Sequence, residues 1–325
     1  MKILIVGGAG YLGGALTDIL KNTSHEILVY DLLLYEESYR KQVPFVYGDV
    51  RDYDKLQKYL DGADVVIWLA ALVGDSACSL NEQLTMDINK RSVEYLRDHF
   101  HGRIIFISSC SIYGASDQML TESSFFNPLS LYAKTKLWGE EILKPRPNTL
   151  IFRLGTLHGV SDQFSRVRFD LVANTLTMRA ALHKKISVFG GKQYRPLLHV
   201  RDAAEMIVQV LDKPISGIYN LHSENTTIIQ IANRVKYFFP DLKVEITDTM
   251  FEDNRNYRVS SEKARMDLGF YPKLTIDDGI KELKHLIEEE RIKNSFLTRF
   301  SNYLYLKPLF TEYHSPLGKV VKLNL

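Results

Sequence analysis

The sequence has little cysteine, no long hydrophobic run and almost no net charge. Only two cysteines, Cys78 and Cys110, occur in 325 residues, so the sequence predicts no disulfide framework and favours a reducing, cytoplasmic location. The apolar run from Ile3 to Val6 is too short for a signal peptide, and no apolar run is long enough to cross a bilayer. We therefore expect a protein that works without a membrane.

The charge balance argues against a polyanionic partner. Forty-one basic residues face 39 acidic ones, which leaves a net charge of +2, and no long basic run occurs. Nucleic-acid-binding domains usually carry a clear basic excess, so we expect no nucleic acid partner. We also expect no metal site. The hydrophobic fraction of 45% is usual for a globular protein. A chain of 325 residues is long enough for two domains or for one domain with a lobe.

The N-terminus has the pattern of a dinucleotide-binding unit. The apolar run from Lys2 to Val6 predicts a buried parallel strand. The segment from Gly7 to Gly14 matches G-x-x-G-x-x-G and precedes a helical pattern, and the next predicted strand, Glu26 to Tyr30, ends in Asp31. Glycines let the backbone approach a diphosphate at a helix N-terminus, and an acid at this distance binds the adenosine ribose. The alternative is a glycine turn for packing only. Asp31 without an adjacent arginine favours NAD over NADP.

Two further predicted strands end in residues that suit a cofactor. Phe45–Tyr47 leads to Asp49 and Val50, and Asp49 suits either the adenine amino group or a cap for the helix that starts near Asp52. The strand from Asp64 to Leu69 ends in Ala70 and Ala71, which are small enough for a cofactor to pass over them. The long helix predicted from Gln83 to His99 carries Asn89, either as a brace for the next strand or as an exposed polar residue.

Three side chains are candidates for proton transfer. The predicted strand from Arg103 to Ile107 leads to Ser109, and a helix opening near Leu129 carries Tyr132 and Lys136 four residues apart, on one helix face. A free phenol has a pKa near ~10, and a nearby ammonium lowers it. With Ser109 holding the substrate hydroxyl, this set suits removal of a proton from an alcohol while hydride leaves its carbon. The spacing alone is not specific, because Tyr303 and Lys307 match it in the C-terminal tail.

Strands and helices alternate through the first half of the chain. This alternation predicts an α/β protein with a Rossmann-type, doubly wound parallel sheet and a smaller C-terminal lobe. We expect residues 1–165 to form the NAD-binding domain, with 195–215 returning to it, and residues 166–194 and 216–290 to form the substrate lobe. The role of the extension 291–325 is open: it packs across a dimer or over the lobe. The predicted cofactor contacts are Gly7, Gly10, Tyr11, Leu12, Asp31, Asp49, Val50, Leu69, Ala70, Ala71, Tyr132 and Lys136.

These motifs resemble the extended short-chain dehydrogenases/reductases of the NAD-dependent epimerase/dehydratase family. The resemblance rests on the N-terminal glycines, Asp31, Asp49, the Ser109 to Gly114 segment and the Tyr132–Lys136 pair, and it extends from Met1 to about Glu290. It implies a nucleotide-diphosphate sugar as substrate. It also implies a homodimer that forms through two helices of the cofactor domain, including the 83–99 and 129–143 segments.

The second half adds motifs that resemble the family's substrate site. Asn174, on a helix predicted from Phe169 to Leu182, matches the family's asparagine at the substrate diphosphate. Arg195 lies in a segment that resembles the family's Arg-x-x-x-His-Val-x-Asp motif, and Arg255 matches a second phosphate-binding arginine. A guanidinium fork suits phosphate oxygens, although each arginine also reads as a surface ion pair.

The residues after Ser109 bear on the reaction. Family members that eliminate water carry Asp-Glu there, whereas this chain has Cys110 and Ser111, which are poor proton donors and acceptors. Members that epimerise next to a 4-keto group place a cysteine where Ser111 stands, so Cys110 is off register and is read as a small buried residue. Ser109, Cys110 and Ser111 remain the predicted substrate-contacting segment.

We therefore expect oxidation of a sugar hydroxyl, at C4, followed by C4 epimerisation or by net C4 oxidation or reduction. Ala70 to Gly74 and Arg166 to Asn174 also resemble a subgroup that includes GDP-heptose 4-dehydrogenases, which favours net redox chemistry. The alternatives are a 4,6-dehydratase, a 3,5-epimerase/reductase, an inactive NAD-binding scaffold or sensor, and an enzyme for a hydrophobic alcohol.

Overall fold

The computed structural model describes residues 1–247, 255–292, 294 and 298–311, and its largest element is a parallel sheet of seven strands. These strands are β1 (Lys2–Val6), β2 (Glu26–Asp31), β3 (Phe45–Tyr47), β4 (Val65–Trp68), β5 (Arg103–Ser109), β7 (Thr149–Leu154) and β11 (Gly217–Leu221). Their order in the sheet is β11-β7-β5-β4-β1-β2-β3. The order reverses between β1 and β4, and ligands of such sheets bind beyond the carboxyl ends of the strands at this point. The predicted doubly wound fold is confirmed.

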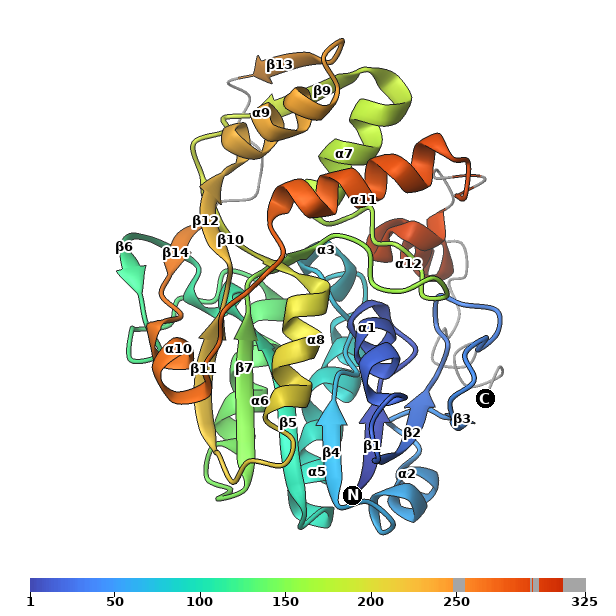
Figure 1. Cartoon of the computed structure of the whole chain (residues 1–325). Coiled ribbons are helices and arrows are strands. Elements are labelled where there is room, and N and C mark those ends of the chain that lie inside the picture. The colour runs from blue at the N-terminus through green and yellow to red at the C-terminus, as the bar shows by residue number, and fades with distance from the viewer. Residues whose placement is uncertain (248–254, 293, 295–297, 312–325) are drawn as a thin grey trace.

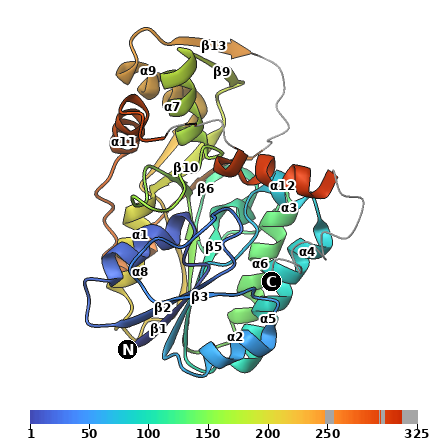
Figure 2. The same cartoon turned by 90° about the vertical axis from the view of Figure 1, so that its right-hand side faces the viewer.

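Helices cover both faces of this sheet (Figures 1 and 2). Successive residues of β1 point to opposite faces, so Ile3 and Ile5 pack with α1 (Tyr11–Leu20) and α8 (Val200–Gln209). Leu4 and Val6 pack on the other face with α2 (Tyr53–Leu60), α5 (Ser92–His99) and α6 (Leu131–Leu143). Burial on both faces explains why the strand sequences are continuously apolar rather than alternating.

The predicted helix from Gln83 to His99 contains an irregular segment. It consists of α4 (Glu82–Met86), a π-helical turn from Asp87 to Arg91, and α5. A π turn adds one residue to the helical repeat and shifts the side chains that follow it. Ahead of α4 lies the short helix α3 (Asp75–Cys78).

The smaller lobe, at the top of Figure 1, consists of helices and short strands. Helices α7 (Val172–His183), α9 (Ile228–Phe238) and α11 (Ile276–Glu288) share an apolar core with β9 (Lys185–Phe189), which pairs with β13 (Lys243–Thr247). Three strands, β8 (Thr156–His158), β10 (Tyr194–His199) and β12 (Glu224–Thr227), form another sheet. The strands β6 (Ala115–Leu120) and β14 (Asn256–Val259) pair in parallel.

Strand pairing and packing bear on the predicted division into domains. Strand β11, assigned to the lobe, is the edge strand of the seven-stranded sheet because its backbone pairs with β7. Helix α10 (Glu262–Leu268) follows it there, since Ala264 and Leu268 pack in the core beneath α1 and α8. Strand β10, in the segment expected to return to the cofactor domain, belongs to the three-stranded sheet, but its Leu198 packs with α8 in the core on one face of the large sheet.

The described part of the C-terminal extension packs against the cofactor domain. A 3-10 turn (Thr298–Phe300) leads to α12 (Asn302–Thr311), which lies beside α3 (Figure 2). Leu306 is 2% exposed and joins the core that contains Leu72 and Cys78. The extension therefore does not lie over the lobe alone. Across the part of the chain that the structure describes, helices are too short or too polar to cross a bilayer.

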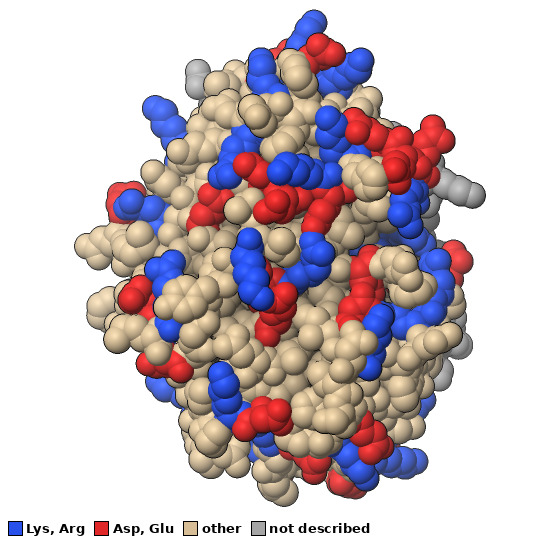
Figure 3. All heavy atoms as spheres, in the orientation of Figure 1, with Lys and Arg blue, Asp and Glu red and all other residues tan. Residues whose placement is uncertain are grey.

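Charged side chains are mixed over the surface. Figure 3 shows basic and acidic groups interspersed on the visible face, with no large described area of one sign. This distribution accords with the net charge of +2.

Candidate functional site

A cavity of about 1330 Å³ lies between the carboxyl ends of the sheet strands and the smaller lobe. It brings together residues predicted for the cofactor, the proton transfer and the substrate. The predicted residues that line it are Gly7, Gly10, Tyr11, Leu12, Asp31, Asp49, Val50, Leu69, Ala70, Ala71, Ser109, Ser111, Tyr132, Lys136, Arg195 and Arg255.

The glycine-rich loop fits the diphosphate of a dinucleotide. Gly7 has φ +84°, and a Cβ there would lie 2.5 Å from the backbone nitrogen of Ala70, so only glycine allows this close approach. Helix α1 starts after Gly10, and among the described residues its N-terminus has no side-chain cap and no acid in the first turn. Its free N–H groups and positive dipole end therefore suit an anion. Tyr11 offers its backbone, since its hydroxyl donates to Gly159 O at 2.5 Å.

Asp31 lies at the end of β2, where an adenosine ribose is expected. One of its carboxylate oxygens accepts from Ala9 N at 3.0 Å and the other from Leu33 N at 2.7 Å. Burial raises the pKa of this carboxyl, while the backbone N–H groups of Leu33 and Ala9 oppose the rise. A carboxylate accepts about four hydrogen bonds, so acceptor positions remain for ribose hydroxyls.

Asp49 does not cap the following helix. Asp52 caps α2, because its side chain accepts from Lys55 N at 3.1 Å. Asp49 instead accepts from the backbone and the guanidinium of Arg51. The cap alternative is therefore wrong, and the adenine contact stays a prediction.

Ser109, Tyr132 and Lys136 meet at the carboxyl end of β5. The Ser130 side chain caps α6, which places Tyr132 in the first turn of the helix. Lys136 donates from Nζ to Ile107 O at 2.8 Å, and its Nζ lies 6.0 Å from the centroid of the Tyr132 ring. This is the arrangement that the four-residue spacing predicts.

Burial dominates the titration of both groups. Burial raises the pKa of the Tyr132 phenol, and hydrogen bonding with Ser109 and the charge of Arg168 oppose the rise. Burial also lowers the pKa of Lys136 to about 8. The sequence predicts that Lys136 lowers the pKa of the phenol. In the structure this pKa is raised, and the contributions that oppose the rise come from Ser109 and Arg168. Arg168 was not predicted as part of the site.

A buried ion pair that the sequence analysis did not predict holds α6 against β7. Arg153, on β7, binds Glu140 through Nε and Nη2, with Nη2 2.6 Å from Oε2, and both side chains are almost fully buried. Ser108 also donates to Glu140, and Arg153 donates to the Tyr113 hydroxyl at 2.7 Å. A signal was present: Glu140 follows Lys136 by one turn, and Arg153 interrupts an otherwise apolar strand.

Asn89 braces the loop after β4. Its Oδ1 accepts from Leu72 N at 2.8 Å, and its Nδ2 donates to Leu72 O at 2.9 Å and to Thr135 Oγ1 at 3.1 Å. The residue is 4% exposed. The exposed alternative is therefore wrong, and the braced segment is the Leu72 loop, held against α6, rather than β5.

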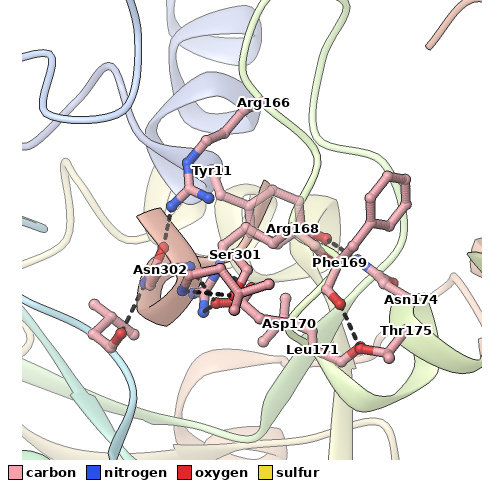
Figure 4. Close-up of polar contacts among 12 residues, drawn as sticks. Tyr11, Arg166, Arg168, Phe169, Asp170, Leu171, Asn174, Thr175, Ser301 and Asn302 are labelled. Atoms are coloured by element: carbon pink, nitrogen blue, oxygen red, sulfur yellow. Dashed lines mark hydrogen bonds and ion pairs between the residues drawn. The ribbon is translucent and has the colours of Figure 1, made fainter. Parts of the chain in front are cut away.

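The structure does not bring Cys110 and Asn174 into the cavity. Cys110 has no exposed surface, and its thiol donates to Arg153 O at 3.2 Å. Asn174 is also fully buried; its Oδ1 accepts from Gly159 N at 3.0 Å and its Nδ2 donates to Arg168 O at 3.0 Å (Figure 4). Both side chains hold the protein's own backbone instead, and the substrate contacts predicted for these two residues stay predictions. Ser111, by contrast, lines the cavity, and its buried hydroxyl has no partner among the described residues.

Arginines gather on the cavity wall. Arg195 is 4% exposed on β10 and donates to the carbonyls of Tyr194 and Arg255. Arg255 pairs with Asp75, its Nη1 lying 3.2 Å from Oδ2. Further arginines that the sequence reasoning did not assign also line the cavity: Arg166, Arg168 and Arg179.

Known proteins resemble this chain along most of its length. A family model for the NAD-dependent epimerase/dehydratase family matches residues 3–221. A UDP-glucose 4-epimerase of Corynebacterium glutamicum is 24% identical, over 89% of this chain and 94% of its own length. A dTDP-glucose 4,6-dehydratase of Neisseria gonorrhoeae is 25% identical, over 86% of this chain and 94% of its own length.

Solved structures share the fold. A UDP-glucose 4-epimerase of Thermotoga maritima with UDP-glucose superposes with a TM-score of 0.79 at 19% identity, over 90% of this chain and all of its own. A UDP-glucuronic acid 4-epimerase of Bacillus cereus, in complex with UDP-glucuronic acid and NAD, gives 0.76 at 24% identity, over 89% of this chain and 99% of its own.

Proposed function

The chain belongs to the NAD-dependent epimerase/dehydratase family, and from this premise we propose that it oxidises a hydroxyl, at C4, of the sugar in a nucleotide-diphosphate sugar. One observation carries the proposal. Ser109, Tyr132 and Lys136 lie in the same cavity as the glycine-rich loop and the arginines of the lobe. A dinucleotide and a sugar nucleotide, bound next to each other in this cavity, would contact all three groups.

Each side chain then has a distinct task. NAD, when bound over the glycine-rich loop, supplies the acceptor for the hydride that leaves the sugar carbon. Ser109 holds the sugar hydroxyl, and Tyr132 takes its proton. Lys136, one turn further along α6, helps to orient the bound NAD and Tyr132. Its ammonium is held by a hydrogen bond to Ile107 O at 2.8 Å. Arg195 and Arg255 hold the substrate diphosphate, because guanidinium forks pair with phosphate oxygens.

The residues after Ser109 favour C4 epimerisation or net C4 redox chemistry over dehydration. Elimination of water requires an acid and a base beside the sugar. Burial raises the pKa of the Cys110 thiol, which also lies outside the cavity. Ser111 reaches the cavity, but a hydroxyl is a poor acid and base near neutral pH. The relatives include epimerases and dehydratases, so these positions, rather than the family, support the choice.

The nucleotide released on denaturation separates the two outcomes. A full equivalent of bound NAD would mean that the cofactor is recycled in place, as an epimerase requires. A protein that takes up NAD reversibly would point to net C4 oxidation or reduction. Released NADP would contradict the assignment of Asp31. Competitive inhibition by free UDP, GDP, dTDP or CDP tests the substrate class, and no inhibition by any of them would refute it.

A further inference from the structure

Two arginines that the proposed reaction does not use line the cavity beside the C-terminal extension. Arg166 and Arg168 lie on the loop between β8 and α7, and Asn302 and Tyr303 of α12 line the same cavity. We propose that Arg166 and Arg168, held in place by the C-terminal segment 298–311, bind the diphosphate of NAD together with the glycine-rich loop. The inference concerns the cofactor and does not depend on which sugar is the substrate.

Neighbouring residues place this pair along the middle of the dinucleotide. The Arg166 backbone N–H donates to Glu36, and its guanidinium lies 3.9 Å from the centroid of the Tyr35 ring, a few residues beyond Asp31. The charge of Arg168 opposes the rise in the pKa of Tyr11, at the start of α1. It also opposes the rise in the pKa of Tyr132, at the end of the cavity where the nicotinamide is expected. The pair thus lies between the residues expected at the adenosine ribose and those expected at the nicotinamide. A dinucleotide places its diphosphate there.

The charge of the pair is incompletely matched. Arg166 is 7% exposed, and the hydrogen bonds of its guanidinium to described residues go to neutral oxygens, Arg299 O at 2.7 Å and the Asn302 amide. Burial and then the charge of Arg168 lower the pKa of Arg166 to about 10, although Tyr35, Asp170 and Glu36 oppose this.

Arg168 has a carboxylate partner but also a free edge. It binds Asp170 through Nε at 2.9 Å and Nη2 at 3.0 Å, which leaves Nη1 available among its described contacts. A buried guanidinium without a carboxylate is costly. An anion that lies between the two arginines would offset this cost, and a diphosphate has the required charge and acceptors.

The C-terminal segment fixes both arginines. Asn302 accepts from Arg166, donates from Nδ2 to Val73 O at 2.7 Å, and donates from its backbone N to Asp170 at 2.9 Å (Figure 4). One residue thus ties the loop after β4 to the loop that carries the arginines. Phe169 N donates to Phe300 O at 2.9 Å, and the two rings lie 5.3 Å apart. Residues of the segment 298–311 therefore form part of the proposed cofactor site.

The substrate also carries a diphosphate, so the test must separate the two ligands. We would measure the affinity of the full-length protein for ADP-ribose, for adenosine and for free UDP, by competition with the fluorescence of bound NADH. ADP-ribose has the cofactor's diphosphate and adenosine lacks it. Replacing Arg166 by Met should weaken ADP-ribose about 10- to 100-fold, because a charge-assisted hydrogen bond is lost, and should leave adenosine nearly unchanged. Arg168→Met should act in the same direction.

A control arginine lies away from the site. Arg265 is on α10, pairs with Glu262 at 3.2 Å and is absent from the described lining of the cavity. Arg265→Met should therefore leave the affinity for ADP-ribose unchanged. Asn302→Leu should weaken ADP-ribose about 3- to 10-fold, because it removes only the acceptor that orients Arg166.

Three results would overturn the proposal. Equal weakening of ADP-ribose and adenosine by Arg166→Met would mean that the arginine only supports the fold of the loop. Unchanged binding of ADP-ribose would exclude a contact with the diphosphate. Weakened binding of UDP with unchanged ADP-ribose would assign the pair to the substrate. None of these readouts requires turnover of a sugar, so the proposed reaction succeeds or fails separately.

Discussion

Replacing Lys136 by Met is expected to stabilise the protein at neutral pH while it abolishes activity. Lys136 is 4% exposed, and burial lowers the pKa of its ammonium from an ordinary value of 10.5 to about 8. Below about pH 8 both the folded and the unfolded chain carry this proton, so the folded state bears the full cost of the buried charge. The shift corresponds to about 3 kcal/mol. Loss of the bond to Ile107 O offsets about 1 kcal/mol, which leaves a net gain of about 2 kcal/mol.

The pH dependence has a definite sign. Between about pH 8 and 10.5 the unfolded chain holds the Lys136 proton and the folded chain has released it. The contribution of this group to the free energy of unfolding therefore rises with pH through this window. The advantage of Lys136→Met over the wild type should be largest near pH 7 and should disappear toward pH 10.5.

Urea unfolding of both proteins near pH 7 and near pH 10 measures this difference. Lys134→Met is the control, because Lys134 is exposed on the same helix, and it should change stability little at either pH. A Lys136→Met protein less stable than the wild type at pH 7 would refute the reasoning. So would a difference that does not change with pH.

Two further substitutions test the support of the site. Glu140→Gln should lower the free energy of unfolding by about 3 to 5 kcal/mol, because it leaves the buried Arg153 guanidinium without its charged partner; chemical denaturation measures the loss. Gly7→Ala should weaken NAD at least about tenfold, because φ is +84° and the new Cβ would lie 2.5 Å from Ala70 N; equilibrium titration with NADH measures the affinity.

Each of these has a neutral counterpart in the chain. Glu141 is exposed beside Glu140, so Glu141→Gln should leave stability unchanged, and an equal loss for both would deny the ion pair its role. Gly62 has only the Tyr59 carbonyl, at 3.9 Å, near the position of a Cβ. Gly62→Ala should keep full affinity for NADH. Tight binding by Gly7→Ala would show that the close approach to Ala70 is dispensable.

The cofactor half was predictable because its signals are local. Lys2–Val6 is almost wholly apolar since both faces of β1 are covered, and the glycines that follow it have the spacing of a dinucleotide-binding loop. The four-residue spacing of Tyr132 and Lys136 put both side chains in the cavity.

The remaining features depend on contacts between distant segments. β11 (Gly217–Leu221) reads as a weak strand, and only its pairing with β7 places it in the large sheet. The helical pattern near Asn174 did not reveal which residues of α7 face the cavity; Thr175 and Arg179 do, and Asn174 does not. The tail has few periodic signals in its sequence. Its packing on the cofactor domain is seen only in the structure, where the buried Leu306 of α12 joins the core.

The most direct test of the proposed function is a single turnover by Tyr132→Phe. Wild-type protein loaded with NAD is mixed with UDP-, GDP-, dTDP- and CDP-sugars, and absorbance near 340 nm and conversion of the sugar are followed. For the nucleotide that reacts, Tyr132→Phe should bind NAD and sugar nucleotide normally but reduce NAD at least about 100-fold more slowly, because the proton acceptor is missing. Undiminished conversion by Tyr132→Phe would contradict the assignment of Tyr132 as the base.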